Sequence, residues 1–143
     1  MTTLAEQRQD TSEPALLRIE AWRDEVVEAH GHHPRSRYAT RFWLPIVGPS
    51  SLVTAGWLVD GLGAAPDGFD VDLVTLGQAL GLPGRAGGHA KIVRTLDRLG
   101  QFGLARLHHT PRPLYRVRLA WPPLTQRQLS RLPAFLVRAH SAA

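Results

Sequence analysis

Apolar residues recur at three- or four-residue spacing in the first part of the chain. Leu16, Ile19, Trp22 and Val26 form one such stripe, with acidic residues between them. This period predicts an amphipathic helix over about residues 13–30. Ser12 can cap the start of this helix, Pro14 suits its first turn, and Gly31 suits its end.

The middle of the chain alternates apolar runs with breaks rich in glycine and proline. An almost uncharged run predicts a central buried helix from Pro49 to about Leu62. The elements predicted after it are a short strand at 68–71, a helix capped by Asp72, a helix at about 90–101, and two strands at 104–109 and 114–119.

A last helix is predicted over about residues 125–140. Thr125 and Gln128 form a capping box at its start. Pro133 lies inside the run and is expected to kink or restart the helix, because proline removes a backbone hydrogen bond.

The helix predicted over 90–101 separates apolar from basic side chains. Its apolar face has four members: Ile92, Val93, Leu96 and Leu99. Its opposite face has three basic members: Lys91, Arg94 and Arg98. The strand predicted over 114–119 alternates apolar residues with Arg116 and Arg118, which is the pattern of a half-exposed strand.

The elements predicted over residues 49–119 follow the order helix, strand, helix, helix, hairpin. The second helix carries the run Leu-Gly-Gln-Ala-Leu-Gly-Leu at 76–82. In this order and this run the chain resembles the winged helix-turn-helix domain of bacterial transcription regulators. The resemblance covers about half of the chain. It implies a mainly α fold with a small β-hairpin (α+β), in which extra N- and C-terminal helices flank a winged-helix core.

Three segments follow from this interpretation. Residues 1–12 are expected to form a disordered tail, and residues 13–37 to form the N-terminal helix and a linker. Residues 38–143 are expected to form the winged-helix domain with its C-terminal helix.

Charge is distributed unevenly along the chain, whose net charge is +5. Residues 1–30 hold seven acidic and three basic side chains, whereas residues 81–143 hold eleven basic side chains and one acidic. This separation predicts a surface that binds a polyanion, and nucleic acid is the expected partner. The alternative is a basic face that is merely solvated.

The resemblance implies where DNA would bind. The third helix of such domains lies in the major groove, where arginine reads guanine, and the hairpin contacts the backbone or the minor groove. The matching positions are Lys91, Arg94, Thr95 and Arg98 on the third helix, Arg112, Arg116 and Arg118 on the hairpin, and Arg85 and His89 at or before the start of the third helix. If about 5–7 of these bases neutralise phosphates, log affinity falls with log salt at a slope of roughly −4.5 to −6.

Other chemistry finds little support in the sequence. There is no cysteine, the histidines at 30, 32 and 33 fall in an expected linker, and His108 and His109 point to opposite faces of an expected strand. Capping and turn roles explain the aspartates around residues 60–72, and no nucleophile or phosphate-loop motif is present. We therefore expect no enzymatic activity, no metal and no cofactor.

The absence of a signal peptide and of an apolar run of about 18 residues predicts a cytoplasmic protein.

We expect double-stranded DNA as the partner and transcription control or a related DNA transaction as the function. The predicted terminal helices at 13–30 and 125–140 are candidates for pairing two copies, because paired regulators read two half-sites. Two alternatives stay open. The domain could be a winged-helix module that binds a protein, or its acidic N-terminal segment could fold over the basic face and block it.

Overall fold

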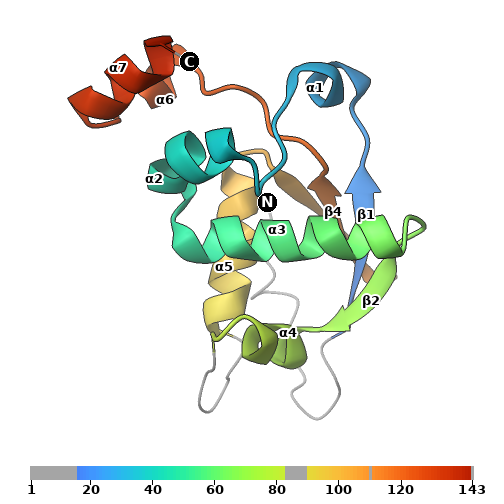
Figure 1. The fold of residues 1–143 in the computed structure, drawn as a ribbon. Helices are drawn as coiled ribbons and strands as arrows, with labels where there is room; N and C mark the ends of the chain where they lie inside the picture. Colours follow the sequence, from blue (N-terminus) through green and yellow to red (C-terminus); the bar gives the residue numbers. More distant parts are fainter. Residues whose placement is uncertain (1–15, 83–89, 110, 143) are drawn as a thin grey trace.

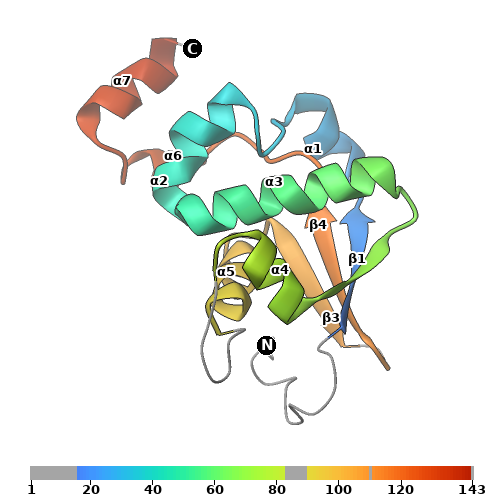
Figure 2. The ribbon, with the colours of Figure 1, turned by 60° about the horizontal axis from the view of Figure 1, so that its bottom comes forward.

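The computed structural model describes residues 16–82, 90–109 and 111–142. Its centre is a four-stranded sheet in the order β2-β1-β4-β3. The strands are β1 (Leu16–Trp22), β2 (Phe69–Asp72), β3 (Ala105–His109) and β4 (Pro113–Arg118). A layer of three helices lies on one side of this sheet (Figures 1 and 2): α3 (Pro49–Ala64), α4 (Leu73–Ala79) and α5 (Ala90–Gln101). The fold is α+β, as the sequence predicts.

The N-terminal apolar stripe forms a strand, so the helix predicted over 13–30 is wrong in this region. In β1, Leu17 and Ile19 point into the core at 1% and 0% exposure, while Leu16 is 56% exposed. Burial therefore alternates, as it does in a strand. β1 pairs antiparallel with β2 and parallel with β4, and so occupies a central position in the sheet.

Only the end of the predicted N-terminal helix is helical. It forms α1 (Glu25–His30), whose N-cap is Asp24, with the carboxylate accepting a hydrogen bond from the Val27 N–H at 3.1 Å. The tail predicted at 1–12 and the predicted cap Ser12 lie outside the described residues. Because residues 16–22 of the first predicted terminal helix form a central strand, this part cannot pair two copies as a helix.

The elements predicted over 49–119 are present in the predicted order. The central helix α3 begins at Pro49, and the Asp72 carboxylate accepts from the Thr75 N–H at 2.9 Å and caps α4. Strands β3 and β4 form the expected hairpin, with Leu107 opposite Tyr115. The one addition is β1, which is inserted between the short strand β2 and this hairpin.

Two tryptophans anchor the segment before α3 to the core. A π-helical turn, η2 (Ala39–Trp43), leads into α2 (Leu44–Val47). The rings of Trp43 and Trp121 meet edge to face at 5.5 Å, and each is 1% exposed. The Trp43 Nε1–H donates to the Pro122 carbonyl at 2.9 Å, so the buried indole has its polar group satisfied.

The C-terminal segment folds as two short helices, α6 (Gln126–Leu129) and α7 (Ala134–Ala142). The capping box is confirmed: the Gln128 N–H donates to Thr125 Oγ1, and the Thr125 N–H donates to Gln128 Oε1. Pro133 separates the two helices, as the sequence predicts. None of the described helices has the length and apolarity that a membrane span requires.

Candidate nucleic-acid interface

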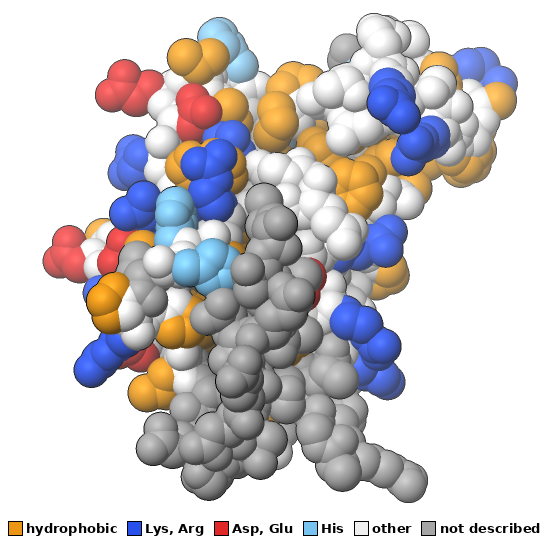
Figure 3. All heavy atoms as spheres, turned by 180° about the vertical axis from the view of Figure 1, so that it is seen from behind, with side chains coloured by type: hydrophobic (Ala, Val, Ile, Leu, Met, Phe, Trp, Pro, Cys, Tyr) orange, Lys and Arg blue, Asp and Glu red, His pale blue; other side chains and the backbone are white. Residues whose placement is uncertain are grey.

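The helix α5 presents one basic face to solvent. Its apolar side chains are buried as predicted, and Ile92, Val93, Leu96 and Leu99 are each at most 2% exposed. Lys91, Arg94 and Arg98 are exposed on the opposite face. Seen from behind (Figure 3), Lys and Arg side chains lie along the edge formed by the α5 side of the molecule, whereas the other edge carries acidic and basic side chains together.

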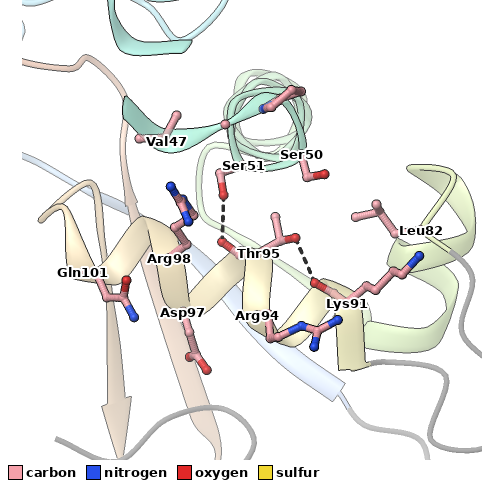
Figure 4. Close-up of a pocket in the computed structure, with 12 residues that line it drawn as sticks. Val47, Ser50, Ser51, Leu82, Lys91, Arg94, Thr95, Asp97, Arg98 and Gln101 are labelled. Carbon is pink, nitrogen blue, oxygen red and sulfur yellow. Dashed lines mark hydrogen bonds between the residues drawn. The ribbon is translucent and has the colours of Figure 1, made fainter. Parts of the chain in front are cut away.

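A groove of about 790 Å³ runs between this basic face and the first turn of α3 (Figure 4). Lys91 and Arg94 lie at one end of the groove and Arg98 lies at the other. Its remaining lining residues are Val47, Gly48, Pro49, Ser50, Ser51, Leu82, Thr95, Asp97 and Gln101. Three basic side chains and one acidic side chain therefore face the same space.

The first turn of α3 adds a positive helix end to the groove. Its N-cap is Gly48, at φ +86°. Because glycine has no side chain, no capping hydrogen bond forms to the backbone N–H groups of the first turn. The next residue, Pro49, has no N–H, and Ser50 and Ser51 follow it. An uncapped helix N-terminus favours an anion, because free N–H groups and the helix dipole point toward it. Sequence reasoning missed this contribution, although a Gly-Pro pair without a capping side chain was a usable signal.

The three basic side chains in the groove differ in how firmly the described residues hold them. Within the described part of the chain, neither Lys91 nor Arg94 forms an ion pair. Arg98 is held more firmly, since its Nη2 donates to the Ile46 carbonyl at 3.2 Å and its guanidinium lies 5.8 Å from the Phe102 ring centroid. Lys91 and Arg94 are thus the cations that are available to an anionic ligand.

Thr95 does not belong to the exposed face, and its predicted position there is wrong. It is 7% exposed. Its hydroxyl donates to the Lys91 carbonyl at 2.8 Å, and its own carbonyl accepts from the Ser51 hydroxyl at 3.2 Å (Figure 4). The reason is helical geometry: Thr95 lies only about 40° around the helix from the buried Leu99. Thr95 joins α5 to α3 and forms the floor of the groove.

The hairpin exposes its predicted cations to different degrees. Arg112 is exposed near the tip, whereas Arg116 is half-buried with its Nε 3.8 Å from Glu20 Oε1. Sequence reasoning missed Arg106, which is exposed and lies opposite Arg116 in the sheet register. The alternation of residues 104–109 was the signal that could have placed Arg106 on the outer face.

Arg118 has a structural role that the prediction of a DNA contact did not foresee. Its Nη1 lies 3.0 Å from Asp24 Oδ2, and its Nε–H donates to the Gly103 carbonyl at 2.8 Å. Its guanidinium also lies 3.7 Å from the centroid of the Trp22 ring. With only 16% of its side chain exposed, Arg118 joins β1 and α1 to the hairpin. We therefore leave Arg118 out of the proposed interface.

The acidic N-terminal part does contact basic residues, but as a fixed part of the sheet. Glu20 on β1 approaches Arg116, its partner in the strand register, and Asp24, just after β1, pairs with Arg118. The described residues 16–30 are therefore not a removable cover. Deleting residues 1–30 would remove a central strand, so that deletion cannot test whether the segment blocks the basic face.

The Asp24–Arg118 pair predicts a specific pH dependence of stability. The hydrogen bond from the Val27 N–H, and then the Arg118 guanidinium, hold the pKa of Asp24 below its ordinary value of 3.8. A lowered folded pKa stabilises the fold above the unfolded pKa, and this contribution is lost as pH falls through the folded value. The difference in urea midpoint between the wild type and Asp24→Asn, which keeps a capping side chain, should be largest above about pH 5 and shrink below about pH 4. A difference that stays constant across this range would contradict a lowered pKa of Asp24.

The last residues to place are the two predicted at the start of α5 and the histidines that were considered as metal ligands. Arg85 and His89 lie outside the described residues. Among the described residues, no group of three histidine, aspartate or glutamate side chains is placed to hold a metal ion. His32 stacks on Tyr38, and the His33 Nδ1 accepts from the Arg35 N–H, so these two histidines have separate surroundings.

Comparison with solved structures finds this fold in another protein. The crystal structure of primosome protein DnaB (residues 1–300) from Geobacillus stearothermophilus is similar, with a TM-score of 0.54 and 19% sequence identity over 90% of this chain and 47% of that chain. At this identity the likeness shows the fold alone, and the present chain spans about half the length of that one. No model of a known protein family and no curated protein sequence matches the chain.

Proposed function

We propose that this chain is a DNA-binding protein with a winged-helix core, acting in transcription control or a related DNA transaction. The observation that carries the proposal is a pair of cations, Lys91 and Arg94, on the exposed face of α5 beside the uncapped first turn of α3. No carboxylate among the described residues forms an ion pair with either of them. The solved structure with the same fold belongs to a primosome protein. The sequence already leaves DNA transactions other than transcription open, and this likeness supports keeping them in the proposal.

The arrangement fits a duplex in a simple way. An exposed helix face of this kind enters the major groove, where Arg94 could read a guanine and Lys91 a neighbouring phosphate. The first turn of α3 would receive a backbone phosphate through its free N–H groups. The start of α5 and the tip of the hairpin point to the same side of the molecule (Figures 1 and 2), so Arg112 is placed to reach the adjacent backbone.

The salt dependence of binding tests this proposal. Five exposed or half-exposed bases remain in the interface: Lys91, Arg94, Arg98, Arg112 and Arg116. If all five meet phosphates, log affinity for a fluorescein-labelled duplex should fall with log salt at a slope of roughly −4.5. The double variant Lys91→Ala/Arg94→Ala should weaken binding at least about tenfold at low salt and reduce the steepness of the slope by about 2, measured by fluorescence anisotropy.

A matched control separates the interface from net charge. Arg127→Ala/Arg131→Ala removes the same charge from exposed positions on and after α6, at the opposite end of the molecule from the start of α5 (Figure 1). This variant should keep nearly the wild-type slope. Equal losses in both variants would mean that net charge alone attracts DNA. Weak and equal binding of all proteins at low salt would instead favour a module that binds a protein.

A further inference from the structure

A second cavity lies between η2 and the C-terminal helix α7, away from the basic groove of α5. Its volume is about 630 Å³, within the range of small-molecule sites in proteins. Its lining residues are His32, Arg37, Tyr38, Arg41, Phe42, Ala139 and Ala142. The α7 side of the cavity is formed by alanines only, and this leaves the space open.

Aromatic rings form a fixed wall of this cavity. The rings of His32 and Tyr38 are stacked, with their centroids 3.8 Å apart and an angle of 13° between their planes. The rings of Phe42 and His140 meet edge to face, with their centroids 5.0 Å apart. The Tyr38 hydroxyl makes a 2.7 Å hydrogen bond with His140 Nε2 and accepts from the Leu124 N–H at 2.9 Å. These bonds hold the tyrosine in place before any ligand arrives.

Two guanidinium groups stand beside this wall, and that of Arg41 lies 5.6 Å from the centroid of the Phe42 ring. Arg37 and Arg41 are exposed, and neither makes an ion pair within the described part of the chain. They lie four residues apart, and none of the described residues that line the cavity is acidic. Burial, and then the charge of His140, lower the pKa of His32, which favours its neutral form. The two arginines carry a permanent positive charge.

We propose that this cavity binds a planar aromatic anion, that is, a flat ring carrying a carboxylate or a phosphate. The ring would lie against Tyr38 and Phe42, and the acid group would accept hydrogen bonds from Arg37 and Arg41. Both features are needed, because an apolar wall alone would bind neutral rings and two arginines alone would bind any anion. The cavity takes no part in the proposed binding of DNA.

Paired ligands test the proposal. Indole-3-acetate and AMP carry the acid group, whereas tryptophol and adenosine have the same rings without it. Each would be titrated to about 10 mM, which detects dissociation constants in the millimolar range, while NMR follows the ring C–H signals of His32 and His140. The two acids should shift these signals at lower concentration than their neutral partners. The acid that exceeds its own neutral partner by the larger factor tells whether the site prefers carboxylate or phosphate.

Two variants check the assignment. Arg37→Gln/Arg41→Gln should weaken binding of the tighter acid by roughly tenfold or more, since hydrogen bonds to charged groups are lost. Ala142→Phe fills the cavity from an exposed position and should abolish binding. The proposal is overturned if neither acid shifts the histidine signals, if the neutral partners bind equally well, or if the arginine variant binds like the wild type.

Discussion

Replacing Trp43 with alanine is expected to lower the free energy of unfolding by about 3–5 kcal/mol. The indole is 1% exposed, packs edge to face on Trp121 and donates its N–H to the Pro122 carbonyl. Alanine would leave a cavity between η2 and the segment after β4, and the carbonyl would lose its donor. Because small domains have a total stability of about 5–15 kcal/mol, this one change removes a large share of it. Urea unfolding followed by far-UV circular dichroism measures the loss.

The same substitution at Trp57 provides the control for Trp43→Ala. Trp57 is only half-buried in α3, and its ring meets Phe69 at a centroid distance of 6.3 Å. Trp57→Ala should therefore cost clearly less than Trp43→Ala. Equal losses at the two positions would contradict the central place of the Trp43–Trp121 pair in the core.

The part of the fold that sequence patterns predict is the part whose signals are local. Pro49, Asp72 and the capping box at Thr125 mark helix starts by interactions with residues only a few positions away. β1 has no such signal. Its partners are β2, about fifty residues later, and β4, almost a hundred residues later. Its apolar residues fit both a helical and an alternating pattern, and only these distant strands decide between them.

The candidate interface also has one part that the sequence predicts and another that it does not. The exposure of Lys91 and Arg94 follows from the period of their own helix, and the sequence predicts it. The other parts of the site depend on contacts between distant elements. Arg118 contacts Trp22, on the strand that was predicted as a helix, and Asp24, just after that strand. The groove forms only because the first turn of α3 lies beside α5.

Two neighbouring leucines give the sharpest test of β1. Leu17→Ala should lower the free energy of unfolding by about 2–5 kcal/mol, because the side chain is 1% exposed and leaves a cavity. Leu16→Ala should change it by no more than about 0.5 kcal/mol, because Leu16 is 56% exposed. A helix over 13–30 makes the opposite prediction, since its apolar stripe contains Leu16 and excludes Leu17. Urea unfolding of the two variants therefore decides between a strand and a helix, and a larger loss for Leu16→Ala would reject the central strand.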